Sequence, residues 1–437
     1  MKIGRIGFLL VGICLMALLI LPVGAKERKP VSVGLDVLAA RTEMRKAGLV
    51  NNDITFEATD FERALNVSSV SSITVAELPV RADGVLYLGN GEVSVGQTVS
   101  RENLCYLNFE FAREDIRDSS FRFTSNGGAY EIACKMSLLE EVNHSPIVSS
   151  ATQTALSVGT YRDVTVYGSL EAFDPEGDRI TFEIVRQPEK GILVMDDTSS
   201  GDYRYIPNAG YTGSDSFRYV AVDQYGNYSE SATVSLKVEA QKNRLVYTDM
   251  TNRIAHVPAI SLTEQGIMEE VKIDGKSCFE PEKGVTRLDF VVAAMKAVGL
   301  ESVKDCEKTV FDDDGSIPKN LKGYVALATE KKYVYGKIQA DGELLLDPDA
   351  GITRAEAAVI LSRMIAAEAP TVKPVFADAN SVPAWAKDAV ETLADLGVMD
   401  SKGGYVNAGA TLTREQTAYM LYMLQRVKSG STEIAYR

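Results

Sequence analysis

A short helix-starting pattern occurs three times in the second half of the chain. It consists of an apolar residue, a threonine and an arginine, and the three arginines are Arg287, Arg354 and Arg414. Glu356 and Gln416 lie three residues after the second and third threonines, as a capping box requires, and Asp289 is a shorter substitute in the first copy. The intervals of 67 and 60 residues between the arginines predict a helical region built from three repeats of about 60 residues.

A second pattern precedes each helix start. An aromatic residue, any residue and an aspartate occur together at Asp249, Asp313 and Asp378. A first helix follows, most clearly over residues 385–390 with Leu393, and Gly397 is its stop. With the Thr-Arg starts, these features resemble S-layer-homology repeats over residues 245–428. The repeats are placed at 241–301, 302–368 and 369–428, the third being the most typical, and a tail follows at 429–437.

The resemblance implies an all-α, three-repeat bundle with pseudo-threefold symmetry. Grooves in such bundles bind a secondary polysaccharide attached to peptidoglycan, often one that carries a pyruvate ketal. A guanidinium group pairs bidentately with a carboxylate of this kind. The resemblance assigns the groove to the three arginines, to Asp249, Asp313 and Asp378, which accept sugar hydroxyls or hold the loop, and to the aromatic Trp385. Ile254 and Asn320 stand where the other two repeats would carry that aromatic residue. The strongest grip is therefore expected around Trp385 and Arg414. In the alternative interpretation, the arginines bridge helices and Trp385 is a core residue.

The first half of the chain has the composition of short strands joined by turns. Residues 52–240 are rich in Val, Ile, Thr, Tyr and Phe, interrupted by Gly, Asp, Asn and Pro. Segments 73–75, 84–86 and 119–123 have counterparts at 180–182, 191–193 and 215–219, which predicts two copies of one module at 52–142 and 143–240. The first copy has an insertion at 89–100, expected to be a hairpin. A lead at 26–51 is expected to include a helix over residues 35–49.

The second copy resembles the cadherin-like, immunoglobulin-like repeats of bacterial surface proteins. The resemblance rests on three segments, at 174–178, 203–207 and 210–217. It implies an antiparallel β-sandwich that serves as a spacer or an adhesive module. Calcium prefers several oxygen ligands, and the oxygen-bearing candidates are Asp174, Glu176, Asp178, Asp223 and Asn227. The alternative is that these residues form polar turns.

The N-terminus has the pattern of a secretory signal peptide. Lys2 and Arg5 precede an apolar run that ends in small residues before Lys26, so cleavage after residue 25 is expected, with an uncleaved anchor as the alternative. The mature chain would then be outside the cell, at the wall or in an S-layer, and without a membrane segment. A net charge of −14 argues against nucleic acid as a partner. Cys105, Cys134, Cys278 and Cys306 are free thiols or two disulfides, Cys105–Cys134 and Cys278–Cys306.

No catalytic motif is found in the sequence. The chain has two histidines, His144 and His256, and lacks the HExxH, GxSxG, P-loop and dinucleotide-binding patterns. A non-enzymatic wall-bound protein is the leading interpretation, and no cofactor other than calcium is expected. A self-assembling S-layer subunit and a wall-remodelling enzyme are the alternatives. The β-modules could meet other surface proteins or further copies of the chain.

Overall fold

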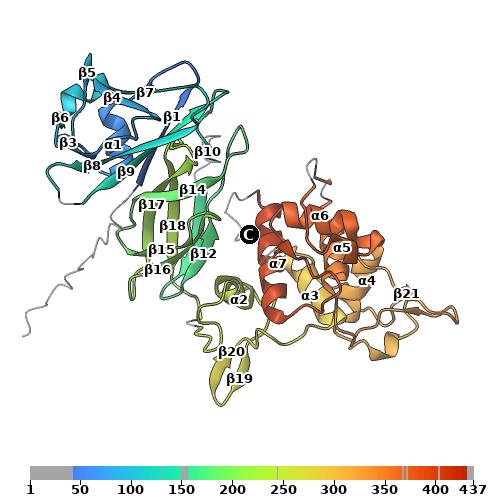
Figure 1. The fold of residues 1–437 in the computed structure, drawn as a ribbon. Helices are drawn as coiled ribbons and strands as arrows, with labels where there is room; N and C mark the ends of the chain where they lie inside the picture. Colours follow the sequence, from blue (N-terminus) through green and yellow to red (C-terminus); the bar gives the residue numbers. More distant parts are fainter. Residues whose placement is uncertain are drawn as a thin grey trace, which may run out of the picture. The chain divides into compact units, whose positions relative to one another are not determined.

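The computed structural model describes residues 43–128, 130–148, 156–243, 245–366, 369–370, 373–401 and 404–430. Strands dominate the first half of the chain and helices the last part (Figure 1). The expected signal peptide lies outside the described residues. Within them, no helix combines the length and the apolar character that crossing a membrane requires.

The first β-module consists of two sheets that enclose an aromatic core. One sheet has the order β1 (Glu43–Leu49), β9 (Ile132–Leu139), β8 (Asp118–Ser125), β3 (Ser72–Glu77), β6 (Thr98–Ser100). The other has the order β2 (Ile54–Thr55), β7 (Leu107–Phe111), β4 (Gly84–Leu88), β5 (Gly91–Glu92). Helix α1 (Ala58–Leu65) and the 3-10 helix η1 (Arg101–Tyr106) complete the module. Phe56, Phe61 and Phe121 are fully buried between these elements.

The helix expected over residues 35–49 is wrong in its described part. Residues 43–49 form β1, which pairs in parallel with all of β9 from Glu43 opposite Ala133 to Leu49 opposite Leu139. This ladder buries Met44, and the long-range pairing outweighs the weak helix preference of the segment. The module therefore begins before residue 52. The insertion at 89–100 is also not a hairpin of its own, because β5 pairs with β4 and β6 pairs with β3.

The second β-module repeats the strand order of the first. Its larger sheet has the order β11 (Leu156–Tyr161), β18 (Ala232–Glu239), β17 (Gly213–Asp223), β14 (Ile180–Arg186). The facing sheet has the order β12 (Val166–Ser169), β16 (Asp202–Pro207), β15 (Gly191–Asp197), and β10 (Ile147–Val148) pairs with β13 (Ala172–Phe173). In both modules the first strand lies parallel to the last, so the sandwiches are not purely antiparallel as expected. The predicted counterparts fall on matching strands, β3 with β14, β4 with β15 and β8 with β17.

Helices and short ribbons follow in the last part of the chain. The helices are α2 (His256–Glu264), α3 (Arg287–Ala297), α4 (Lys322–Glu330), α5 (Arg354–Ile365), α6 (Lys387–Asp395) and α7 (Arg414–Lys428). Single-turn 3-10 helices occur at η3 (Asp314–Ser316), η4 (Ala379–Ser381) and η5 (Ala384–Ala386). Two hairpins, β19 (Val271–Ile273) with β20 (Lys276–Cys278) and β21 (Lys337–Ile338) with β22 (Leu344–Leu345), show that the region is not purely α-helical as expected.

The three Thr-Arg helix starts form as the sequence predicts. The hydroxyl of each threonine accepts the backbone N–H three residues on, at 3.1 Å from Asp289 to Thr286, 3.2 Å from Glu356 to Thr353 and 3.3 Å from Gln416 to Thr413. The second and third starts are full capping boxes, because the side chains of Glu356 and Gln416 accept the N–H of their threonines.

Backbone hydrogen bonds join the three helix starts in a closed ring. The N–H of Val285 donates to the carbonyl of Leu412 (2.9 Å), that of Leu412 donates to Ile352 (2.9 Å), and that of Ile352 donates back to Val285 (3.0 Å). All three apolar side chains are buried. Around this ring, α3 packs against α4, α5 against α6, and α7 against α2. The second helix of each repeat therefore meets the first helix of the next, and the last repeat closes onto the first.

Candidate functional sites

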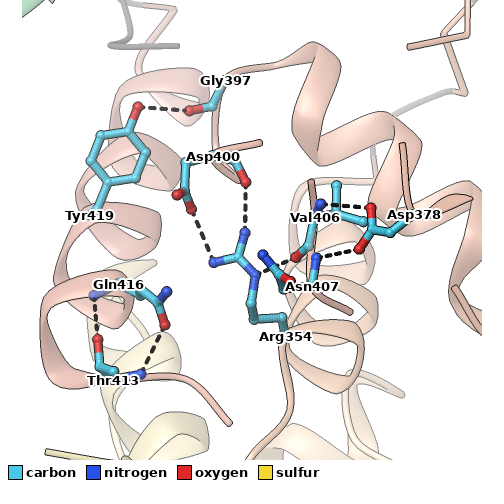
Figure 2. Close-up of polar contacts among 9 residues, drawn as sticks. All are labelled: Arg354, Asp378, Gly397, Asp400, Val406, Asn407, Thr413, Gln416 and Tyr419. Atoms are coloured by element: carbon cyan, nitrogen blue, oxygen red, sulfur yellow. Dashed lines mark hydrogen bonds and ion pairs between the residues drawn. The ribbon is translucent and has the colours of Figure 1, made fainter. Parts of the chain in front are cut away.

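The leading aspartates of the three repeats hold loops. Asp378 accepts the backbone N–H groups of Val406 (3.0 Å) and Asn407 (2.8 Å), as Figure 2 shows. Burial opposes ionisation of Asp378, but these two N–H groups, its own N–H and the hydroxyl of Ser381 together outweigh it and lower its pKa. Equivalent bonds run from Leu346 and Asp347 to Asp313, and from Phe279 and Glu280 to Asp249. Of the two roles expected for these aspartates, holding the loop is the one that the geometry displays.

Arg354 reaches from the second repeat into the third. Its Nε donates to the carbonyl of Val406 (2.6 Å), its Nη1 to Oδ1 of Asp400 (3.0 Å) and its Nη2 to the carbonyl of Asp400 (2.6 Å) (Figure 2). The side chain is only 3% exposed. Val406 is thus held through its N–H by Asp378 and through its carbonyl by Arg354. We call this arrangement the third junction, because the loop that it holds belongs to the third repeat.

Arg414 makes the corresponding contacts with the first repeat. Its Nε donates to the carbonyl of Phe279 and its Nη2 to the carbonyl of Glu269, both at 2.7 Å. The guanidinium also lies 4.8 Å from the ring centroid of Phe279, within the range of a cation–π contact. Since the N–H of Phe279 donates to Asp249, the same residue is again held from both sides. This is the first junction.

Arg287 is held less completely at the second junction. Its Nη2 donates to the carbonyl of Tyr335 (3.0 Å), and its Nη1 lies 3.5 Å from Glu356, which also pairs with Lys337. The Nε is buried and has no partner among the described residues. Burial lowers the pKa of Arg287, although the charge of Glu356 opposes this effect.

Trp385 is exposed rather than part of the core. Its exposed fraction is 62%, and it lies in η5, which packs against α5 and α6. Ile254 is half-buried and Asn320 is exposed at the equivalent positions. Trp385 belongs to the repeat that Arg354 contacts, whereas Arg414 contacts the first repeat. Arg414, expected to form one strong site with Trp385, thus makes its contacts in a different repeat from that of Trp385.

Three of the five calcium candidates converge in the second β-module. Asp174 and Asp178 flank a turn, Asp223 ends β17, and one carboxylate oxygen from each lies within 4.8 Å of the other two. The two remaining candidates make other contacts. Glu176 accepts from the backbone N–H of His144 (3.0 Å) and contacts its Nδ1 (2.6 Å), and Asn227 donates its Nδ2 to Asp223 (2.8 Å).

The electrostatics of this carboxylate trio fit a cation. Burial, followed by the charges of Asp174 and Asp223, raises the pKa of Asp178. Oδ2 of Asp174 is buried and has no hydrogen-bond partner in the described structure. A Ca²⁺ ion held by Asp174, Asp178 and Asp223 would neutralise the repulsion and satisfy that oxygen, and oxygen donors are the ligands that Ca²⁺ prefers.

Three residues near these sites were missed from the sequence. Asn143 donates to Oδ2 of Asp223 (2.6 Å), and Gln224 donates to Oδ1 of Asp178 (2.8 Å). Asp400 pairs with Arg354. Gln224 directly follows Asp223, so its position next to a calcium candidate could have been recognised in the sequence. Asn143 and Asp400, by contrast, are brought to their partners only by the fold.

The four cysteines of the described residues are free thiols. Cys105 is exposed, Cys306 is half-buried, and Cys134 and Cys278 are buried. Of the two interpretations left open by the sequence, the structure has the one without disulfides. Burial also raises the pKa of Cys134 far above its usual range, so this thiol is not a reactive thiolate.

Comparisons with known proteins match two parts of the chain. The model of the bacterial cadherin-like domain matches residues 143–240, and that of the S-layer homology domain matches residues 375–418. The exoglucanase XynX of Acetivibrio thermocellus is 30% identical over 152 residues, which are 33% of this chain and 13% of that protein. The surface-layer 125 kDa protein of Lysinibacillus sphaericus is 30% identical over 141 residues, 31% of this chain and 11% of that protein.

The chain thus spans only a small part of the length of these relatives. Among solved structures, an endo-fucoidan hydrolase from glycoside hydrolase family 107 is 16% identical, with 46% of this chain and 28% of that chain covered, but its TM-score of 0.19 carries no argument. The family matches confirm both resemblances seen in the sequence. The chain is a protein that carries an S-layer homology domain and a bacterial cadherin-like domain.

Proposed function

We propose that this is an exported, non-enzymatic surface protein that three S-layer-homology repeats hold non-covalently to the cell wall. The repeats form a bundle with pseudo-threefold symmetry and bind a secondary polysaccharide attached to peptidoglycan. The two β-modules are displayed outward as spacers or adhesive modules. The proposed location is the cell wall or an S-layer, consistent with the S-layer homology domain over 375–418.

The observation that carries this proposal is the closed ring of Val285, Ile352 and Leu412. It joins the three Thr-Arg starts by one kind of backbone hydrogen bond, which supports the extension of the family match at 375–418 to three repeats. The same bracing of a loop by an aspartate and an arginine occurs at the first and third junctions. This recurrence supports three copies of one unit.

Co-sedimentation with purified cell walls tests the proposal. The mature chain should sediment with intact walls and remain in solution with walls from which the secondary polymer has been stripped. Trp385→Ala should weaken the sedimentation, because an exposed aromatic ring is the kind of residue that dominates binding energy. Equal sedimentation with intact and stripped walls would contradict polysaccharide recognition.

Two alternatives are separated by direct observation. The likeness to a surface-layer protein favours a self-assembling S-layer subunit, which predicts ordered sheets in electron micrographs of the purified chain. The likeness to an exoglucanase favours a wall-remodelling enzyme, which predicts soluble fragments released from peptidoglycan or wall polysaccharide. Our proposal predicts neither sheets nor fragments.

Calcium binding by Asp174, Asp178 and Asp223 is a second candidate function. The convergence of three carboxylates and the buried unpartnered oxygen of Asp174 support it. Calorimetric titration of the full chain with Ca²⁺ should give one site that Asp223→Asn abolishes. No heat of binding at millimolar Ca²⁺ would exclude the site.

A further inference from the structure

The acidic surroundings of the arginines differ between the first and third junctions. Position 400 and position 269 are equivalent, because the backbone carbonyl of each accepts Nη2 of the junction arginine. Asp400 also places its carboxylate 3.0 Å from Arg354. Arg414 has no ion pair within the part of the chain that the structure describes, and Glu269 contacts it only through the backbone.

Arg354 is closed to an anionic ligand by these contacts. Its side chain is 3% exposed, and Nε, Nη1 and Nη2 each donate to an atom of the protein. A ligand carboxylate would have to displace that of Asp400, which is 34% exposed and already pairs with the guanidinium. Because the pair leaves no uncompensated positive charge, an anionic group gains no attraction there and meets the carboxylate of Asp400 at close range.

The third repeat instead offers groups that can bind an uncharged sugar. Asp400 can accept hydroxyl hydrogens. The 3-10 helix η5, which packs against α5, the helix that begins with Arg354, exposes the ring of Trp385, on which the apolar face of a sugar can pack. Arg414 is half-buried, lies over the ring of Phe279 and lacks a carboxylate partner among the described residues. It is the junction arginine whose charge is not already neutralised by the protein.

We propose that the third junction takes an uncharged sugar unit and that Asp400 is the residue that excludes anionic units from it. The anionic units of the wall polymer are left to Arg414 at the first junction. This inference rests on the proposed function, since it divides the recognition of one wall polymer between two junctions of the same region.

The test uses the mature full chain and two wall preparations. Native cell walls are compared with walls whose carboxyl groups have been chemically reduced to hydroxyls, at about 50 and about 500 mM salt. Asp400→Asn leaves the charge of Arg354 unpaired, so it should strengthen binding to native walls by about threefold at low salt and make that binding more salt-dependent. Binding to reduced walls should not change.

Two further variants complete the design. Asp341→Asn removes the same charge in the exposed turn between β21 and β22, outside the first and third junctions, and it should behave as the unmodified chain. Trp385→Ala should weaken binding to native and reduced walls by the same factor, about tenfold, because the ring meets an uncharged unit. If Asp400→Asn fails to fold, as judged by thermal unfolding, Asp400→Ser takes its place. The effect of Trp385→Ala on native and on reduced walls is then the second test of the charge selection.

The failures of the two proposals are distinguishable. An Asp400 variant that folds but keeps the wall preference and salt dependence of the unmodified chain overturns the charge selection. So does a Trp385→Ala effect confined to native walls. If the unmodified chain sediments with neither preparation, the proposed wall-binding function itself is wrong, and the inference that rests on it is wrong too.

Discussion

The helical region and the second β-module use aspartate in opposite ways. At Asp378, two backbone N–H groups donate to the carboxylate and lower its pKa. At Asp178, burial and two neighbouring carboxylates raise the pKa. A carboxylate surrounded by donors is satisfied by the protein and has a structural role. In the second β-module, Oδ2 of Asp174 has no donor among the described residues and lies in a group of three carboxylates. We therefore propose that the same residue type has a structural role in one region and binds a cation in the other.

The largest expected effect is stabilisation of the second β-module by calcium. At a concentration 100-fold above the dissociation constant, Ca²⁺ should raise the free energy of unfolding of this module by about 2.7 kcal/mol. Hydrogen-exchange mass spectrometry should show stronger protection of β14 and β17. Asp223→Asn serves as the control and should abolish the gain. Equal protection of the helical region would mean that calcium acts elsewhere, and the contrast between the regions would be lost.

A somewhat smaller effect is expected from Asp378→Ala. The N–H of the buried Val406 loses its acceptor, so the helical region should lose about 1–3 kcal/mol of stability. Trp385 is the single tryptophan of the chain, so its fluorescence during urea unfolding reports on this region. Asp378→Asn keeps one acceptor oxygen and should lose less. Unchanged stability of Asp378→Ala would show that the loop does not depend on this aspartate.

Asp178→Asn should change the stability of its region in the opposite direction to Asp378→Ala. Without calcium, removal of one of three facing charges should stabilise the second β-module by less than about 1 kcal/mol. With calcium, the same change should destabilise the module, because a ligand is lost. Hydrogen exchange of β14 with and without Ca²⁺ measures both. A variant that is destabilised under both conditions would indicate that the hydrogen bond from Gln224 matters more than the repulsion.

The smallest effects are those of pH, and they also have opposite signs. Because the pKa of Asp378 is lowered from 3.8, its stabilisation is present above that value and is lost as the pH falls through the folded-state pKa. Because the pKa of Asp178 is raised from 3.8, its destabilising effect is absent at lower pH and grows as the pH rises through the folded-state pKa.

Hydrogen exchange between about pH 3 and 6 in calcium-free buffer, with each Asp→Asn variant as reference, separates the two trends. Relative to its reference, the helical region should gain protection as the pH rises, while the second β-module should lose it. Trends of the same sign in both regions would remove the contrast between the two kinds of aspartate.

Much of the fold could be predicted because it depends on local chemistry. The threonine caps at 286, 353 and 413 follow from the residues three positions on. The correspondence of β3 in the first module with β14 in the second, and of β8 with β17, follows from repeated segments. The prediction of a helix at residues 43–49 was wrong because the structure of this segment depends on a distant partner. This segment becomes a strand only because β9, whose paired residues lie 90 positions later, supplies its parallel partner.

The candidate sites divide in the same way. Asp174 and Asp178 are four residues apart in one turn, and Oδ1 of Asp174 accepts the N–H of Asp178 (3.0 Å), so their proximity is legible in the sequence. Asp223 joins them only through the sheet that pairs β17 with β14. From the sequence, Arg414 and Trp385 were expected to form one binding site, because both belong to the third repeat.

The sequence by itself determined the three capped helix starts, the corresponding strand segments of the first half and the residues that carry charge, because these depend on neighbours a few positions away. Only the tertiary structure decided which arginine serves which repeat. Closure of the ring turns each arginine toward the next repeat, so that Arg354 meets Asp400 and Arg414 meets Phe279. Such pairings depend on distance in space between segments remote in the chain, and no local pattern records that distance.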